Sequence, residues 1–316
     1  MIVTTRFPDL PPRPQTPSNA AFRQAFFARW GLENTVFLAS TRQFESMTQT
    51  AALSVKLAEQ GRATLRVGRR ELMLEAGHCL VVNEGEPYSV RISGEVPMRA
   101  FSLHFRPGLA AEVATARAET WQRALERGGH EPARSAPWLR DDLHLPSAAL
   151  LDIVAAVRRR VLEGDRDGQS YEPLFIGALD RLLADSHQQR RGAAASLQAV
   201  RASTRGELLR RAGWAHDFIF SHYAEPISLD QIAAAAHLSK YHLLRTFHQV
   251  YGQTPHAALN ERRAQIAQAL LTEGRADLVT VAETAGFGSR WAMQRALRRQ
   301  YGATARALRG RQREAR

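Results

Sequence analysis

The residues most suited to chemistry are the arginines near the end of the chain. From residue 286 to residue 316 the only acidic residue is Glu314, against nine arginines: Arg290, Arg295, Arg298, Arg299, Arg306, Arg309, Arg311, Arg313 and Arg316. A guanidinium group can hold a phosphate, or the edge of a guanine, through two parallel hydrogen bonds. The whole chain of 316 residues has a formal net charge of +12. This surplus favours a polyanionic partner, either nucleic acid or an acidic membrane surface, with a merely solubilising surface as the alternative.

Most of these arginines follow or lie in a segment that repeats an earlier one. The stretch SLDQIAAAAHLSKYHLLRTFHQVYG at 228–252 recurs about fifty residues later as TVAETAGFGSRWAMQRALRRQYG at 280–302. Each copy predicts a short helix, a tight turn and a second helix, with capping boxes starting at Ser228 and Thr280 and an N-cap at Ser239. The inward anchors of the second helices are predicted at Leu243 and Phe247 in the first copy and at Met293 and Leu297 in the second.

A rigid helix is predicted between the two copies. Thr254 caps it, Pro255 opens it and Gly274 closes it, which makes it about 18 residues long. Two helices joined by a tight turn, with a basic and polar outer face, are typical of a helix-turn-helix unit. Two such units on a stiff spacer could present their second helices to successive major grooves, about 34 Å apart. The alternative is an ordinary helical bundle with a chance repeat, which the paired Tyr-Gly ends and paired arginines disfavour.

The N-terminal part of the chain predicts strands rather than helices. A proline-rich, extended and mobile arm is expected at 1–20, followed by a strand-rich domain at 21–110. This domain starts with a short helix or strand at 21–30, and from about 34 to 107 apolar and polar residues alternate with a period of two. RATLRV, YSVRI and FSLHF show this alternation, and turns recur between them, which indicates a small antiparallel barrel or sandwich. In FSLHF we expect the three apolar residues to point inward and His104 to face solvent.

Helical periodicity begins near residue 111. The region 111–190 predicts amphipathic helices that either pair with a second subunit or cover the strands, and 191–205 is the best candidate for a linker. The remaining 206–310 is predicted to be nearly all helix. The fold class is therefore α+β, with an antiparallel β-barrel, a helical connector and an all-α C-terminal domain.

Residues 210–309 resemble the DNA-binding domain of AraC/XylS-type bacterial transcription regulators. The resemblance is carried by SLDQIAAAAHLSKYHLLRTFHQVYGQTP, RRAQIAQALL and VAETAGFGSRWAMQRALRRQYG. The strand-rich phrase GRATLRVGRRELMLEAGHCLVVNEGEPYSV resembles the cupin-like sensor domain of the same family. The sequence departs from the family pattern at His237, which replaces a glycine, and at Ala305, which replaces a proline. Aromatics are also usual where Met293 and Leu297 stand.

The resemblance implies which residues contact DNA. The exposed face near the start of each second helix reads bases in this family, which here gives Tyr241, Leu244, Arg245, Arg290, Trp291, Gln294 and Arg295. Arginine suits guanine, glutamine suits adenine, and an apolar side chain suits a thymine methyl group. The expected contacts to the DNA backbone are Ser239, Lys240, His242, Thr254, Arg298 and Arg299.

The strand-rich domain is expected to bind a small-molecule effector. Tyr88 is the first candidate for a wall residue, with Trp30 and Arg42 as further ones. The competing hypothesis is a metal-dependent cupin enzyme with an accessory basic helical domain, which needs converging histidines and a carboxylate. Only His78, Cys79 and His104 on the strands are soft ligands, so we expect no metal, no cofactor and no catalytic residue. A third alternative is an architectural DNA binder without a ligand.

These patterns together predict a ligand-responsive transcription regulator. Its expected partners are double-stranded promoter or operator DNA, a small-molecule effector, a second copy of the chain and RNA polymerase. The chain shows no signal-peptide pattern and no apolar run of the roughly 20 residues that cross a bilayer, so we expect a cytoplasmic protein without a membrane partner. Cys79 is the single cysteine, which excludes a disulfide within the chain.

Overall fold

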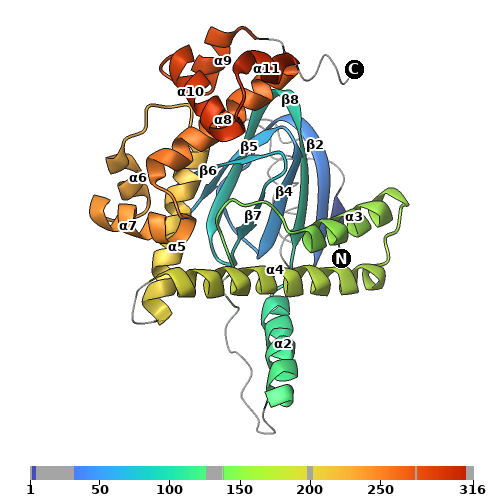
Figure 1. Cartoon of the computed structure of the whole chain (residues 1–316). Coiled ribbons are helices and arrows are strands. Elements are labelled where there is room, and N and C mark those ends of the chain that lie inside the picture. The colour runs from blue at the N-terminus through green and yellow to red at the C-terminus, as the bar shows by residue number, and fades with distance from the viewer. Residues whose placement is uncertain are drawn as a thin grey trace. The chain divides into compact units, whose positions relative to one another are not determined.

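The chain forms two compact units. The structure, a computed structural model, describes residues 2–4, 32–125, 137, 139–197, 202–274 and 276–310. The N-terminal unit is Met1–Gly192 and the C-terminal unit is Ala193–Arg316 (Figure 1). The boundary falls inside the expected linker 191–205, but helices occupy both ends of that segment. The expected strand or helix at 21–30 lies outside the described residues.

A mixed eight-stranded sheet makes up most of the N-terminal unit. The strands are β1 (Ile2–Thr4), β2 (Thr35–Glu45), β3 (Gln49–Thr50), β4 (Ser54–Gln60), β5 (Arg62–Val67), β6 (Arg70–Glu75), β7 (Cys79–Val82) and β8 (Pro87–His104). The long β8 pairs antiparallel with β2, β3, β4 and β5, whereas β1 pairs parallel with β2. The first residues are therefore not part of a mobile arm, because Ile2 and Val3 precede the prolines and are free to pair.

The predicted alternation holds in β5, where Ala63, Leu65 and Val67 are buried. The prediction that the His104 side chain of β8 faces solvent is wrong, because this residue is 2% exposed. Both faces of this end of β8 are buried: Phe101 and Leu103 join a cluster with the helices, while Ser102 and His104 line a cavity on the other face. The sequence shows the period of two, but it does not show that helices cover the outer face.

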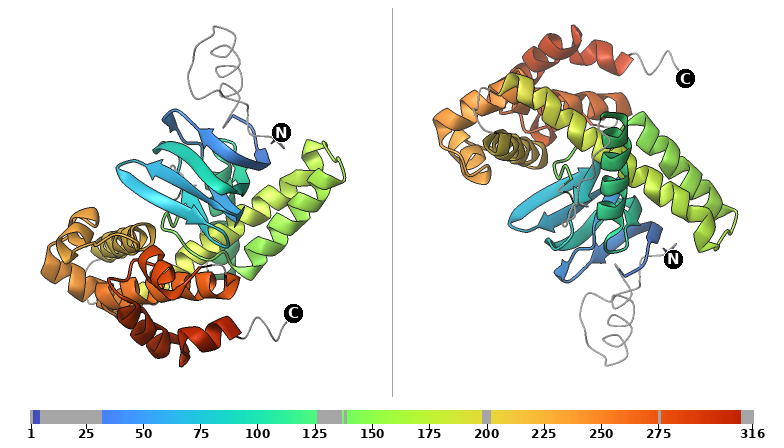
Figure 2. Two further views of the ribbon diagram at one scale, coloured as in Figure 1. Left: turned by 90° about the horizontal axis from the view of Figure 1, so that it is seen from above. Right: turned by 90° about the horizontal axis from the view of Figure 1, so that it is seen from below.

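The described residues of the N-terminal unit also form three helices, α2 (Leu109–Leu125), α3 (Ala148–Leu162) and α4 (Gly168–Ser196). α3 and α4 lie side by side against the sheet (Figures 1 and 2). Val157 of α3 and Leu179 of α4 are fully buried in one cluster with Leu103, and the rings of Phe105 and Phe175 meet edge to face at 5.7 Å. The apolar stripe of these helices therefore covers the sheet.

The C-terminal unit is helical, as predicted. It contains α5 (Ala202–Ser221), α6 (Leu229–Ala235), α7 (Lys240–Tyr251), α8 (Pro255–Glu273), α9 (Leu278–Thr284), α10 (Arg290–Tyr301) and α11 (Ala305–Gly310). Ser228 forms the expected capping box, and Ser239 and Thr254 cap α7 and α8. Gly274 ends α8 in the left-handed region, which gives a spacer of 19 residues. No described helix has the length and apolar character required to cross a bilayer.

The predicted capping box at Thr280 is wrong, because Asp277 caps α9 instead. Its carboxylate accepts the backbone N–H groups of Val279 and Thr280, at 2.7 and 3.0 Å, and the Thr280 hydroxyl at 3.0 Å. A carboxylate also gains from the positive end of the helix dipole, which a threonine hydroxyl cannot do as well. These hydrogen bonds hold the pKa of Asp277 below its usual value.

Each helix-turn-helix unit has its own core, and α8 contributes to both. Ala258 and Leu259 pack with α5, α6 and α7, whereas Ala267 and Leu271 pack with α9, α10 and α11. Ile266 packs against both clusters. The predicted inward anchors Leu243, Phe247, Met293 and Leu297 are all fully buried. The spacer is thus an integral part of both units.

The two turns adopt the left-handed backbone region at equivalent positions. His237 has a φ of 51° and Gly286 a φ of 79°. A side chain fits at His237, where the imidazole meets the Trp214 ring at 5.8 Å. None fits at Gly286, because a Cβ atom there would lie 2.4 Å from the carbonyl oxygen of Tyr223 and 2.8 Å from the Cα of Ala224.

Gly286→Ala is therefore expected to destabilise the C-terminal unit by roughly 3 kcal/mol, from the left-handed backbone and the clash together. Gly288→Ala is the matched control, because nothing lies within 4 Å of a Cβ atom there. Its effect should stay within about 0.5 kcal/mol. Thermal unfolding of the full chain measures both, and equal midpoints for the two variants would contradict the packing at Gly286.

Candidate DNA-contacting surface and ligand cavity

The expected base-contacting residues of the first unit lie on the exposed side of α7. Tyr241 is 70% exposed and Leu244 40%, and Arg245 is exposed as well. Their side of the helix lies opposite Leu243 and Phe247, which are fully buried. Large apolar side chains such as Tyr241 and Leu244 are costly to leave in water, and they suit a surface that meets base edges or thymine methyl groups.

The second unit presents a comparable surface on α10. Arg290, Trp291 and Arg295 are exposed, and Gln294 is partly buried. The Arg290 guanidinium lies 5.5 Å from the centre of the Trp291 ring, a cation–π contact that orients both groups. Between residues 286 and 310 the sequence has six arginines and no Asp or Glu. The surface of α10 is therefore strongly cationic.

The residues expected to contact the DNA backbone differ in the hydrogen bonds and ion pairs that they already make within the unit. The Ser239 and Thr254 hydroxyls already accept backbone N–H groups as helix caps, and the Thr254 hydroxyl keeps its own proton to donate. The Lys240 ammonium lies 2.8 Å from the Asp230 carboxylate in an exposed pair, which contributes little stability and is easily exchanged. The His242 ring lies 3.0 Å from the Ser239 hydroxyl. Arg298 and Arg299 are exposed at the end of α10.

Three consecutive residues of α8 make hydrogen bonds or ring contacts with neighbouring segments of the C-terminal unit. Glu261 accepts from Gln253 and from Gln300 of α10, at 3.0 and 3.1 Å. Arg262 is buried over the Phe220 ring, 3.6 Å from its centre. Arg263 donates to the carbonyl oxygens of Tyr223 and Glu225, at 2.7 and 2.8 Å.

The sheet of the N-terminal unit encloses a cavity. Its volume is about 80 Å³, and it is partly open to solvent. Tyr88, the first candidate for a wall residue, lines this cavity, and its hydroxyl accepts a hydrogen bond from Gln49 at 2.7 Å. Arg42 does not line this cavity; it is exposed where the register between β2 and β8 is irregular. Trp30 lies outside the described residues.

Lys56 is the lining residue that sequence reasoning missed. It lies on β4, is 7% exposed, and places its ammonium 4.7 Å from the centre of the Tyr88 ring. Burial lowers the pKa of this ammonium to about 7. The sequence SVKLA could have indicated this position. Its lysine stands between two apolar residues, and the residues two positions before and after it on the same strand face are a serine and an alanine, which are small.

His104 shares the cavity with Lys56. Burial, and then the charge of Lys56, hold the pKa of His104 well below its usual range, so the imidazole is neutral near pH 7. Cys79 is buried on the helix-covered side of the sheet, and burial raises the pKa of its thiol to about 12. The described residues contain no group of three His, Cys, Asp or Glu side chains that could hold a metal ion.

Lys56→Met should stabilise the protein most at pH values of 7 and below. The unfolded lysine holds its proton up to about pH 10, whereas the folded one loses it near pH 7, so the folded state gains stability as the pH rises through this window. Removing the lysine removes that dependence. We expect a gain of about 3 kcal/mol at pH 7 that falls toward zero near pH 10. Calorimetry of the full chain at both pH values measures it, and a gain that grows with pH would contradict the burial of Lys56.

Two family models match the chain. A model described as an AraC-like ligand binding domain matches residues 40–150, and a model described as a helix-turn-helix domain matches residues 232–311. These ranges contain most of the cavity-lining strands and both helix-turn-helix units.

Curated relatives match this chain over a short segment only. The chain is 31% identical over 77 residues to the RCS-specific HTH-type transcriptional activator RclR of Escherichia coli (strain K12), covering 24% of this chain and 27% of that protein. It is 30% identical over 86 residues to the probable transcriptional regulator LumQ of Photobacterium leiognathi, covering 27% and 35%. The matches thus span less than half of either relative.

Among solved structures, that of ToxT from Vibrio cholerae is similar at 9% identity and a TM-score of 0.33, covering 87% of this chain and 98% of that one. The family models carry the assignment, because each matches the unit in which the corresponding geometry is found. The chain therefore contains an AraC-like ligand binding domain followed by a helix-turn-helix domain.

Proposed function

We propose that this protein is a sequence-specific transcription regulator whose binding to double-stranded promoter or operator DNA is changed by a small molecule in the sheet cavity. One observation carries the proposal: two helix-turn-helix units share α8 and leave the polar, arginine-bearing sides of α7 and α10 exposed. The core residues of both second helices are buried, and the opposite sides, which carry these arginines, are exposed.

The chemistry of the side chains on this surface indicates which residues contact bases and which contact phosphates. Arg245 and Arg295 occupy equivalent places in the two units, and each can grip guanine in the major groove. Gln294 suits adenine, and Tyr241, Leu244 and Trp291 offer apolar contact to thymine methyl groups. Arg298 and Arg299, near the end of α10, suit phosphates, which set the register of the protein on the duplex.

The shared spacer supports simultaneous binding by both units. α8 has 19 residues, which at 1.5 Å per residue corresponds to about 28 Å of helix. This is of the order of one turn of duplex, about 34 Å, that separates successive major-groove contacts on one side of DNA. A spacer whose own residues belong to both cores holds its two helices more firmly than a flexible loop would.

The competing metal-dependent cupin enzyme has less support. His104 is the only histidine lining the cavity among the described residues, and it shares that space with Lys56. An ammonium group beside an imidazole disfavours a metal cation by charge repulsion, and it favours an anion. The cavity therefore suits an effector better than a metal centre.

Selection of duplexes from a random pool by the full chain tests the function. A regulator should enrich one motif, and its binding to that motif should survive competitor DNA. The logarithm of its affinity should fall linearly with the logarithm of salt, at roughly 0.9 per phosphate neutralised. Enrichment of no motif, with equal affinity for all duplexes, would overturn the proposal.

Two arginines of α10 should respond differently to truncation. Arg295→Ala is expected to relax preference at one base pair of the motif, at a cost of about 1–3 kcal/mol against the preferred base. Arg299→Ala should weaken binding to every sequence alike and reduce the salt slope by about 1. Titrations on the motif and on single-base variants separate the two, and equal losses on all sequences for both variants would contradict these roles.

Further partners belong to the same proposal. Leu151 and Leu162 of α3 and Ile176 of α4 are 46%, 71% and 41% exposed, which supports pairing of two copies through these helices. Sedimentation of the full chain over a range of concentrations tests this, and a monomer at all of them would contradict it.

The proposed regulation of promoters also implies contact with RNA polymerase and a cytoplasmic location, where the chromosome lies.

A further inference from the structure

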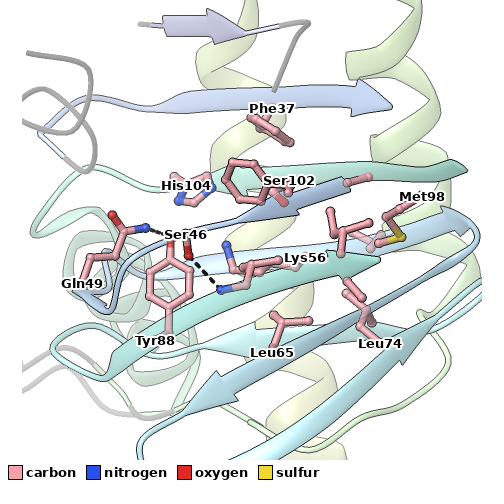
Figure 3. Close-up of a pocket in the computed structure, with 16 residues that line it drawn as sticks. Phe37, Ser46, Gln49, Lys56, Leu65, Leu74, Tyr88, Met98, Ser102 and His104 are labelled. Atoms are coloured by element: carbon pink, nitrogen blue, oxygen red, sulfur yellow. Dashed lines mark hydrogen bonds between the residues drawn. The ribbon is translucent and has the colours of Figure 1, made fainter. Parts of the chain in front are cut away.

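The cavity has a polar end and an apolar end. Figure 3 shows Ser46, Gln49, Tyr88 and His104 grouped at one end, and Leu65, Leu74 and Met98 at the other, with Lys56 between them reaching toward the polar group. Ser46 and Gln49 are already engaged, since the Ser46 hydroxyl accepts the Val90 N–H at 2.8 Å and Gln49 donates to Tyr88. The cavity is therefore amphipathic along its length, and Lys56 is its only formal cation among the described residues.

Strand register explains how these groups converge. Lys56 of β4 pairs with Ser102 of β8, and Ser54 pairs with His104. Residues two apart on a strand share a face, so Lys56, Ser102 and His104 all project from the same side of two neighbouring strands. Burial of this whole face keeps bulk water away from the ammonium.

Lys56 has no anionic partner among the residues that the structure describes. Its one contact of a polar or charged kind is with the Tyr88 ring, and the described lining of the cavity contains no Asp or Glu. A buried ammonium is costly unless an anion pairs with it. A ligand that carries one anion would supply that missing partner.

We propose that this cavity binds an amphipathic monocarboxylate, whose carboxylate pairs with the Lys56 ammonium beside His104 and whose apolar body lies against Leu65, Leu74 and Met98. The inference rests on the proposed function only in taking the cavity as the effector site. A dianionic phosphate would find one cation for its two charges, and a sugar would leave several hydroxyl groups without partners against the apolar wall. A wholly apolar ligand would bury Lys56 further without pairing it.

The pairing makes binding depend on pH in a defined direction. Burial leaves Lys56 with a pKa of about 7, so the free protein must take up a proton to bind the acid at higher pH. The other titratable groups that line the described cavity are Tyr88 and His104, and His104 stays neutral through this range. Affinity for a carboxylate should therefore fall roughly tenfold between pH 6 and pH 8. Affinity for a neutral ligand of the same shape should not fall.

Calorimetric titration of the full chain tests the inference with matched pairs of probes. Octanoate is compared with 1-octanol, and 4-phenylbutanoate with 4-phenylbutanol, at pH 6 and pH 8. At pH 6 at least one acid should bind ten or more times tighter than its alcohol, and the preference should shrink at pH 8. Lys56→Met should abolish the preference, whereas Arg62→Met, an exposed cation on neighbouring β5, should keep it.

Several results would overturn the inference. These are alcohols that bind as tightly as the acids, a preference that survives Lys56→Met, or no binding by any straight-chain acid from butanoate to dodecanoate and by 4-phenylbutanoate. An octanal adduct on Lys56 that borohydride traps, without acid binding, would assign the cavity to carbonyl compounds instead. Specific DNA binding without acid binding removes this inference alone, whereas acid binding without specific DNA binding removes the regulator proposal.

Discussion

The geometry of the C-terminal unit depends on the hydrogen bonds that Arg263 makes at the end of α5. A helix ends with carbonyl groups that lack partners within the helix, and a buried end needs donors from elsewhere. Arg263, from the middle of α8, donates to the carbonyl oxygens of Tyr223 and Glu225 just beyond α5. Gly286 of the second turn packs against the same Tyr223 carbonyl. One guanidinium thus joins α5, the spacer and the second helix-turn-helix unit, and burial lowers its pKa without removing its charge.

This arrangement explains why the spacer can hold two recognition helices in a fixed relation. Glu261 reaches Gln253, before α8, and Gln300, at the end of α10. Arg262 stacks on Phe220 of α5. Successive residues of a helix point about 100° apart, so these three side chains reach three different neighbours from one turn. Loss of any one of them would loosen a different element, and the relation between α7 and α10 depends on all three.

The fold was largely predictable because its helices and strands obey local rules. Ser228, Ser239, Thr254 and Gly274 cap helices at the predicted positions, since capping is decided within a few residues. The predictions were wrong where contacts with distant segments of the chain determine whether a side chain is buried. His104 faces a cavity because α3 and α4, more than 40 residues further along the chain, cover the other face of β8. Lys56 is buried because it lines this cavity together with residues of β5 and β8. Alternation reveals two faces of a strand, but not which of them meets the cavity.

The same double burial connects the cavity wall to α4. His104 faces the cavity, and the next residue, Phe105, packs its ring against Phe175 of α4. α4 continues to Ser196, past the boundary of the N-terminal unit at Gly192. A ligand shifts the balance between two arrangements only by its difference in affinity for them. An anion that pairs with Lys56 acts on β4 and β8 at the point where their outer sides carry α4, because close-packed interiors transmit small displacements rather than absorb them. The strand that forms the cavity wall is therefore also the support of the helix that leads out of the unit.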